Sequence, residues 1–451
     1  MERRRASRLD KVEPPATIAA GERARQLSRQ GRDIIDLGQS SPHHVTPEHI
    51  IEAGVKALRD GMTNIESPRG LPEFREAMAE KLARHNGLDI NPGGDVLVTP
   101  GSKQGLYYSV NAFIGEGDEV LLIEPTWVSF RQQVQLSQGI PVAVPLSEEE
   151  EYAITYEGLR RYITPRTKAM VINNPNNPTG RVYTLTELEA VARLATENNL
   201  LVICDETYEY FIYGSNKHHT LAALPGMWER TLTSYTFTKS YSMAGWRLGC
   251  IVGPEALLEP LLQIQEHTAS FVSPFIQMAG IAAVTGPQDH IEDWRAECAG
   301  LATAVVDRLN AVDGVQCPLP QGATFVFPRF SMERTSVELA GLLVESQGVV
   351  ITPGIGFGES GEGHVRIALM RSPAERVREG VERIATALET SALRSITAAF
   401  SVLLRAKTIR REVRSAPISA ASSASEINAP LLAEVSDISS SSSLPITTVS
   451  R

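Results

Sequence analysis

The chain has 451 residues and a hydrophobic content of 42%, which is ordinary for a globular protein and enough to bury the cores of two domains. Its formal net charge of -10 argues against a nucleic-acid binder, because such proteins concentrate Lys and Arg to neutralise phosphates. No apolar run is long enough to cross a bilayer, and the four scattered cysteines lack CxxC spacing, so we expect reduced thiols and a cytoplasmic protein.

The first two thirds of the chain predict alternating helices and strands. Residues 15–38 predict an amphipathic helix that ends near Gly31, followed by a short strand in IIDLG. From about Pro47 to Asp289, helical stretches alternate with the apolar runs DVLVTPG, EVLLIEP, KAMVINNP, LLVICDE, TLTSYTF and LGCIVGP. This alternation predicts an α/β fold, in which helices flank a mostly parallel sheet that is buried on both faces. Functional loops are then expected at the carboxyl ends of the strands.

The region 291–390 predicts a smaller α/β unit. A long helix is expected in WRAECAGLATAVVDRLNAV, strands in ATFVFPRF and GHVRIALM, and a closing helix in SPAERVREGVERIATALE. From residue 391 to 451 the composition shifts towards Ser and Ala. We expect this tail to be disordered, apart from one candidate helix at 391–414.

Three loops at predicted strand ends carry side chains that suggest ligand binding: TPGSKQGLYY, NNPNNPTG and CDETYEYF. Gly101 and Ser102 precede a helix, where free backbone N–H groups favour an anion, although a simple helix cap is the alternative. Asn177 can present its amide to a ligand from an irregular Asn-Pro turn. Asp205 ends a buried run, so its carboxylate needs a partner, either a structural one or a cationic ligand nitrogen.

Lys239 lies among seven hydroxyl side chains in SYTFTKSYSMAGWRLG, eight residues before Arg247. An exposed lysine gains little from such neighbours because water satisfies its ammonium group. The topology of a parallel sheet predicts that Asp205, Lys239 and the loop at 101–103 face one crevice. This combination of a carboxylate, an amine and an anion site is more informative than any one of its members.

The motifs GSKQG, EPTW, NNPNNPTG, DETY, SYTFTKSYSMAGWRLG and HVRIALM occur in this order along the chain. In this respect the chain resembles the class I/II aminotransferases, which depend on pyridoxal phosphate and have the aspartate aminotransferase-like fold type I. The resemblance covers roughly residues 5–390. It implies a large cofactor-binding domain at 47–290 and a smaller domain at 291–390, to which residues 1–46 contribute. It also implies amino transfer from an L-amino acid to a 2-oxo acid by a ping-pong mechanism, in a homodimer with the active site at the interface.

The resemblance assigns roles to individual residues. Lys239 matches the lysine that binds the cofactor covalently and moves the substrate proton, and Asp205 matches the partner of the pyridine nitrogen. Asn177 and Tyr208 match hydrogen-bonding partners of the phenolate oxygen, and Trp127 matches the aromatic residue that stacks on the ring. The residues that match phosphate-binding groups are Ser102, the backbone of Lys103, Thr236 and Arg247. Those that match substrate-binding groups are Gly38, Asn177 and Arg366, of which the arginine binds the α-carboxylate.

The sequence departs from the family pattern at two places. The family usually has a tyrosine five residues before the position of Gly70, where it reaches the cofactor phosphate of the partner subunit, but here that position is Ile65. The substrate loop reads GQSSPHH, and we expect His43 and His44 to face solvent, with substrate contact as the alternative and no metal binding suggested by their spacing.

The side chain of Lys103 matches a lysine that meets the distal carboxylate in relatives acting on aspartate or prephenate, which favours an acidic donor.

Two other functions compete with amino transfer. A lyase, a decarboxylase or a cyclising or oxidising enzyme of the same fold would share Lys239 and Asp205, because the cofactor performs the common step. A non-enzymatic binder, such as the effector domain of a regulator, would normally carry an N-terminal DNA-binding module. Residues 1–30 are too short for such a module.

Overall fold

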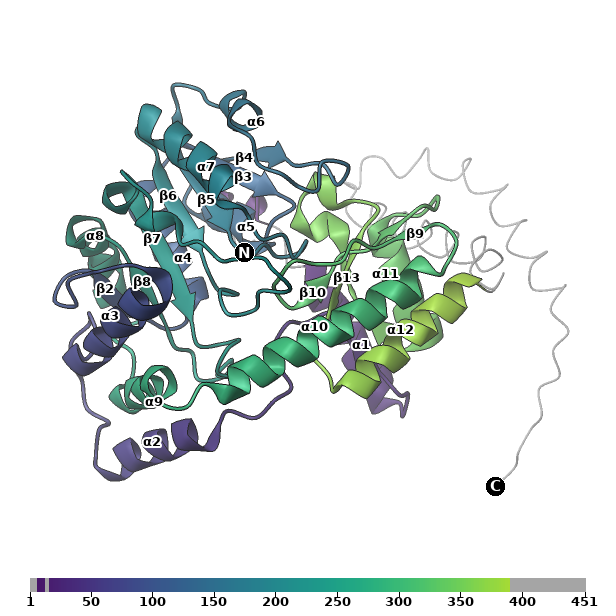
Figure 1. Ribbon diagram of the computed structural model, residues 1–451, viewed down its shortest axis with the longest axis horizontal. Coiled ribbons are helices and arrows are strands. Elements are labelled where there is room, and N and C mark those ends of the chain that lie inside the picture. Colours follow the sequence, from purple (N-terminus) through teal and green to yellow (C-terminus); the bar gives the residue numbers. More distant parts are fainter. Residues whose placement is uncertain (1–5, 13–15, 390–451) are drawn as a thin grey trace, which may run out of the picture. The chain divides into compact units, whose positions relative to one another are not determined.

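The computed structural model describes residues 6–12 and 16–389, with side-chain detail from residue 21 onwards in the second range (Figure 1). The expected disorder and the candidate helix beyond residue 390 lie outside the described residues. No helix in the described ranges combines the length and the apolarity that are needed to span a membrane.

A seven-stranded sheet forms the centre of the fold, in the order β2-β8-β7-β6-β5-β3-β4. Its strands are β2 (Val96–Thr99), β3 (Glu119–Glu124), β4 (Ile140–Pro145), β5 (Thr167–Asn173), β6 (Leu201–Asp205), β7 (Thr231–Thr236) and β8 (Gly249–Val252). β3 to β7 pair in parallel, whereas β8 is antiparallel to both β2 and β7. The predicted mostly parallel sheet is confirmed, with β8 as its antiparallel member.

Both faces of the sheet are covered by helices (Figure 1). The helices of this part of the chain are α2 (Glu48–Arg59), α3 (Pro72–Asn86), α4 (Ser102–Phe113), α5 (Ser129–Leu136), α6 (Tyr156–Arg160), α7 (Leu185–Glu197), α8 (Glu255–Glu266) and α9 (Pro274–Thr285). In β5, Met170 and Ile172 pack into one core cluster with residues of α7, while Ala169 and Val171 pack into another with residues of α4 and α5. Because alternate side chains enter different cores, the strand is apolar throughout rather than alternating.

The remaining elements form smaller sheets and helices. The helices are α1 (Ala16–Arg29), α10 (Asp289–Asn310), α11 (Ser336–Gln347) and α12 (Ala374–Glu389), of which α10 and α12 lie side by side (Figure 1). β13 (Thr352–Pro353), β14 (Val365–Ala368) and β10 (Phe325–Val326) form an antiparallel sheet, and β9 (Val315–Gln316) pairs with β11 (Arg329–Phe330). The single strand expected in ATFVFPRF is thus wrong, because it is divided near Pro328, which has no N–H to donate.

The N-terminal segment joins this second group of elements. β1 (Ile35–Asp36) pairs in parallel with β12 (Val349–Val350), although more than 300 residues separate them in sequence. Ala24 and Leu27 of α1 share a core cluster with Val344 and Val350. This pairing fixes the start of the loop that carries Gly38 and Ser40. The division of the chain into domains at residues 46 and 290 stays a prediction.

Candidate active site

A cavity of about 220 Å³ lies at the carboxyl ends of the parallel strands. Its lining residues are Ser40, Ser102, Lys103, Trp127, Asn177, Asp205, Thr207, Tyr208, Thr236, Thr238, Lys239 and Arg247. Every residue that the sequence predicted to hold the cofactor is among them. Strand register explains this convergence, since Asp205 is paired with Asn173 on β5 and with Ser234 on β7, so the loops that follow these strands begin at one level.

Lys239 is buried, and its amine is held by the N-terminal segment. The Nζ atom donates hydrogen bonds to the carbonyl oxygen of Ser40 at 2.6 Å and to its Oγ at 2.9 Å. Burial and then the positive charge of Arg366 lower the pKa of Lys239 to about 7, while the negative charge of Asp205 opposes them. A large fraction of the amine is therefore neutral near pH 7, as a nucleophile or a general base requires.

Asp205 is a buried carboxylate whose hydrogen bonds do not offset the loss of hydration of its negative charge. The hydroxyl and backbone N–H of Thr207 donate to its Oδ1 at 2.5 and 3.2 Å. Burial nevertheless raises the pKa of Asp205 from 3.8 to about 6, against the effect of these hydrogen bonds and of Lys239. A cationic nitrogen placed beside this carboxylate would relieve the penalty of burying it.

Hydrogen-bond donors gather at the other end of the cavity. Ser102 begins α4, where backbone N–H groups and the helix dipole favour an anion, and the guanidinium of Arg247 lies next to it. A Cβ on Gly101 would collide with that guanidinium, and a Cβ on Gly249 would lie 2.6 Å from the backbone nitrogen of Ser102. Glycine at both positions therefore leaves room for the guanidinium of Arg247 beside the first turn of α4. The backbone of Arg247 itself adopts a left-handed φ of 59°.

Trp127 forms one wall of the cavity. Its ring contacts Phe130 edge to face, with ring centroids 5.2 Å apart. The ammonium of Lys103 lies 5.0 Å from the centroid of the Trp127 ring, within the range of a cation–π contact. The backbone of Lys103 is part of the first turn of α4, so this residue offers both a backbone donor and a side-chain cation to the cavity.

The three residues predicted to bind substrate lie together. Arg366 on β14 is buried, and it donates to Asn177 Oδ1 at 2.9 Å and to the carbonyl oxygen of Gly38 at 2.6 Å. The rings of Phe325 and Phe357 flank its guanidinium at 4.5 and 5.0 Å. Burial lowers the pKa of Arg366 to about 10, so the group remains charged at neutral pH. Its Nε is buried and has no hydrogen-bond partner among the described residues, which leaves a donor for an anionic ligand.

The chemistry of these groups fits pyridoxal 5'-phosphate. The donors around Ser102, Thr236 and Arg247 could hold a phosphate, and Trp127 offers a flat apolar face to a pyridine ring. Asp205 could pair with the ring nitrogen, and the amine of Lys239 could bond to the aldehyde carbon.

Sequence reasoning missed several polar residues of this site. Ser40, Thr207 and Thr238 line the cavity, and each lies within two residues of a predicted one, so a search of the motif neighbours would have found them. Thr352 could not be found in this way, because it lies far from every predicted residue in sequence. It pairs with Arg366 between β13 and β14, accepts a hydrogen bond from that residue, and donates one to the carbonyl oxygen of Gly38.

The two histidines of the substrate loop differ from expectation. They were expected to face solvent, but both are half-buried and have protein partners. His43 Nδ1 lies 3.1 Å from the carbonyl oxygen of Met370, and His44 Nε2 lies 3.0 Å from Glu297 Oε2. By contrast, the side chain of Ile65 is 82% exposed.

Comparison with known proteins agrees with this geometry. Residues 32–384 match the family described as aminotransferase class I and II. The chain is 37% identical to an aspartate aminotransferase of Geobacillus stearothermophilus, over 86% of this chain and 99% of the relative. It is 38% identical to an aromatic-amino-acid aminotransferase of Thermococcus litoralis, over 80% of this chain and 93% of that one.

A solved structure resembles the chain over the same region. The aspartate aminotransferase of Thermus thermophilus, determined with maleate, has a TM-score of 0.81 and 36% sequence identity, and the match covers 86% of this chain and all of that one. The sequence match, the fold and the composition of the cavity agree. The chain therefore belongs to the class I and II aminotransferases, which are pyridoxal-phosphate-dependent enzymes of fold type I.

Proposed function

We propose that Lys239 performs the proton transfers of this aminotransferase, and that an acidic L-amino acid is its preferred donor. One observation carries the proposal: a buried amine with a pKa of about 7 shares a cavity with the buried carboxylate of Asp205, and the buried cation of Arg366 lies beside them. An amine, an acid and a carboxylate-binding cation are the groups that amino transfer needs from the protein.

The cofactor would be held at four places: the ring nitrogen, the phenolate oxygen, the ring face and the phosphate. Pyridoxal phosphate supplies an electron sink for the electrons released when a bond at the substrate Cα breaks. Asp205 would keep the ring nitrogen protonated, Asn177 and Tyr208 would donate to the phenolate oxygen, and Trp127 would cover the ring. The groups proposed for the phosphate are Ser102, the backbone of Lys103, Thr236 and Arg247.

Arg366 and Lys239 would act on different groups of the substrate, its α-carboxylate and its Cα proton. The guanidinium of Arg366 would bind the α-carboxylate with the donors that remain to it, and its bond to Asn177 fixes its orientation. Lys239 would then take the proton from the substrate Cα as a neutral amine and return a proton on the way to the 2-oxo acid product. The hydrogen bonds from its amine to Ser40 keep this group at one place between the two steps.

The preference for an acidic donor rests on charge. The side chain of Lys103 brings a cation to the cavity, and within the described part of the chain it forms no ion pair with a carboxylate. Lys103 would meet the distal carboxylate of an aspartate-like donor. The names of several relatives support this choice, since they are aspartate aminotransferases, and the Thermus thermophilus structure was determined with maleate. An aromatic donor is the second candidate, because the Thermococcus litoralis relative is named for aromatic amino acids.

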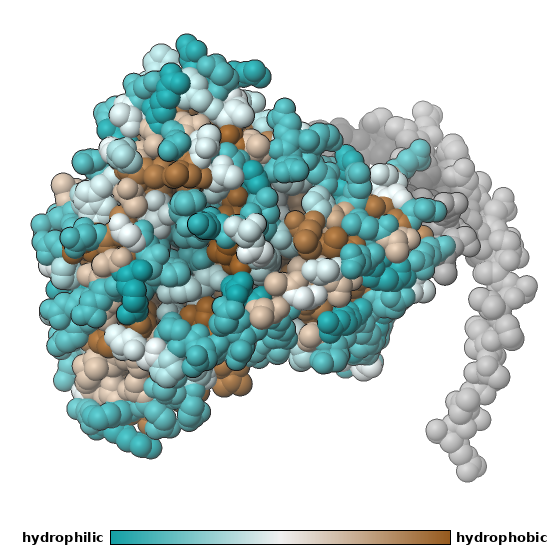
Figure 2. Space-filling view, in the orientation of Figure 1, coloured by the Kyte–Doolittle hydropathy of each residue, from teal (hydrophilic) through white to brown (hydrophobic). Residues whose placement is uncertain are grey.

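We further propose a homodimer in the cytoplasm. Val45 and Ile65, which lie on either side of α2 in the sequence, are 77% and 82% exposed. A second copy of the chain would cover them. The face shown in Figure 2 is mainly hydrophilic, with scattered hydrophobic patches. The four cysteines are free and buried, which suits a reducing compartment.

One experiment tests the reaction and the donor together. The protein is purified with pyridoxal phosphate, and its absorption spectrum is recorded while single amino acids are added. Aspartate or glutamate is expected to convert the cofactor to pyridoxamine phosphate faster than phenylalanine does. Recovery of the aldehyde form with release of ammonia or carbon dioxide would instead indicate a lyase or a decarboxylase. Light scattering of the same sample should give the mass of two chains, and a monomer with full activity would refute the dimer.

A further inference from the structure

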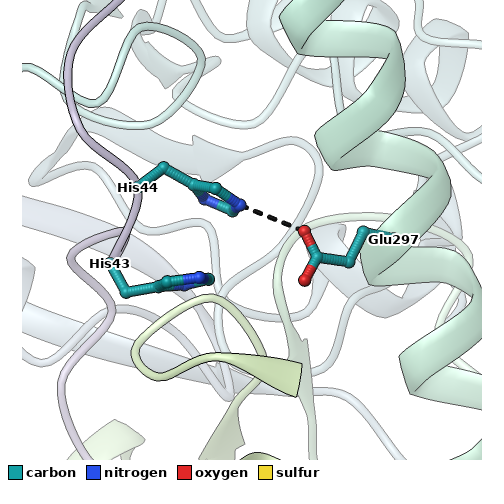
Figure 3. A group of neighbouring side chains, drawn as sticks. All are labelled: His43, His44 and Glu297. Carbon is teal, nitrogen blue, oxygen red and sulfur yellow. Dashed lines mark hydrogen bonds and ion pairs between the residues drawn. The ribbon is translucent and has the colours of Figure 1, made fainter. Parts of the chain in front are cut away.

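Two histidines and a glutamate form a cluster outside the cofactor cavity. His43 and His44 come from the segment that follows Ser40, and Glu297 comes from α10 (Figure 3). One ligand atom from each of the three lies within 4.8 Å of the others, and His44 Nε2 is 3.0 Å from Glu297 Oε2. None of the three lines the cavity that contains Lys239.

We propose that this cluster is a binding site for a divalent transition-metal ion, with zinc as the best match. Two imidazole nitrogens and one carboxylate oxygen are ligands that zinc prefers, and a water molecule would complete a tetrahedron. Metal–ligand distances near 2.0 Å place neighbouring ligand atoms about 3.3 Å apart around such an ion. The separation of 3.0 Å between His44 and Glu297 is close to this value, and small side-chain rotations would bring the third ligand into range.

The surroundings of the histidines prepare them to bind a metal. The Nδ1 of His43 is 3.1 Å from the carbonyl oxygen of Met370, and the backbone N–H of His43 donates to the same oxygen. A carbonyl only accepts, so this contact places the proton on Nδ1 and leaves a lone pair on Nε2. A hydrogen bond from the second ring nitrogen to a carbonyl is the usual support of a metal-binding histidine.

The ring of His44 is held by packing on both sides. It lies 4.0 Å from the ring of His43 and stacks on Trp294 at 4.4 Å, measured between ring centroids. Its Nδ1 is buried and has no hydrogen-bond partner in the described part of the chain. The packing of the ring fixes the direction in which Nε2 faces Glu297, so the ligand atom of His44 is already positioned beside the carboxylate.

A metal ion at this place would affect the active site through the backbone. The carbonyl oxygen of His44 accepts a hydrogen bond from Ser242, which is three residues after Lys239, and Ser40 in the same segment holds the amine of Lys239. Binding the segment to α10 through Glu297 would therefore restrict the position of Ser40. Reversible binding of a divalent metal ion would thus regulate the active site by fixing Ser40 beside the amine of Lys239.

A second group of potential ligands consists of Glu206, Glu209 and His218. Its carboxylates already have protein partners: Lys81 forms an ion pair with Glu209, and Tyr235 donates to Glu206 at 3.0 Å. Removing a buried carboxylate from its partners is costly, so this group is the weaker candidate and serves as the internal comparison.

The test is zinc binding to the holoenzyme, which is first treated with a chelator and then dialysed. Isothermal titration with Zn²⁺ is expected to show one tight site per chain. The variants His44→Gln, His43→Asn and Glu297→Gln should each weaken the binding at least about 10-fold. The variant His267→Gln, which alters an exposed histidine, should leave it unchanged. Three separate variants keep the test valid should one of them fail to fold, which thermal unfolding would reveal.

Two spectroscopic signals locate the ion. Co²⁺ at the site should give the visible bands of tetrahedral coordination, and it should quench the fluorescence of Trp294, an effect that Trp294→Phe removes. Binding that survives all three ligand variants, or that is lost in His218→Gln instead, would overturn the proposal. The absence of saturable binding of Zn²⁺ would overturn it as well.

Discussion

Asp205→Asn should stabilise the cofactor-free protein while it impairs catalysis. The pKa of Asp205 rises from 3.8 to about 6 on folding, a difference of about 2 units, or about 3 kcal/mol at 1.36 kcal/mol for each unit. The native state binds this proton more tightly than the unfolded state does. The contribution of Asp205 to stability is therefore greatest below pH 3.8 and is lost as the pH rises through about 6. An amide of the same shape avoids this loss because it carries no charge, and its oxygen can still accept the hydrogen bonds from Thr207.

Denaturant unfolding of both cofactor-free proteins measures this effect. At pH 8 the variant should be more stable by up to about 3 kcal/mol, and the difference should shrink towards zero near pH 4. The amine of Lys239 is mostly neutral at pH 8, so the loss of its charged neighbour matters little there. Asp313→Asn, which alters an exposed carboxylate, is the matched control and should change stability by less than about 0.5 kcal/mol. A variant that is less stable than the wild type at pH 8, or a difference that does not depend on pH, would refute the reasoning.

Four further predictions concern the loaded enzyme. Lys239→Ala should lower the rate of amino transfer by at least about 100-fold and abolish the absorption band of the lysine-bound cofactor; retention of that band would contradict the assignment. Arg366→Lys should reduce kcat/KM by about 10- to 100-fold for every amino acid donor, because a charged hydrogen bond contributes about 1.5–3 kcal/mol. Lys103→Gln should reduce kcat/KM for aspartate about 10-fold but leave that for phenylalanine within about 2-fold, and an equal loss for both would exclude a role in donor choice. Ile65→Tyr should slow the loss of cofactor during dialysis, since a tyrosine there could reach the phosphate of a second subunit, and an unchanged rate would argue against that contact.

The strands and the loops that follow them could be predicted from local sequence. Continuous apolar runs such as LLVICDE indicate strands that are buried on both faces, and in a parallel sheet their carboxyl ends meet at one edge. Asp205 and Lys239 could thus be placed in one crevice without knowledge of the fold. The antiparallel direction of β8 could not, because hydrophobic periodicity does not encode strand direction.

Contacts between distant segments account for what sequence reasoning missed. Ser40 reaches Lys239 because the segment before it is held by β12, β13 and β14, and no spacing rule connects positions 199 residues apart. His44 and Glu297 are brought together in the same way. The local pattern GQSSPHH resembles an exposed loop, and burial of its histidines depends on α10, which lies far along the chain.

The order of the site along the chain has a consequence for biosynthesis. Every residue that lines the cavity around Lys239 lies between Ser40 and Arg247, whereas Arg366 lies in β14, near the end of the described residues. A ribosome would therefore release all the proposed cofactor ligands before it adds the residue that binds the substrate carboxylate. β12, the partner of β1, also emerges late, so Ser40 has no fixed position beside Lys239 in a shorter nascent chain. The group proposed to bind the substrate carboxylate is therefore completed only after the proposed cofactor ligands have been synthesised.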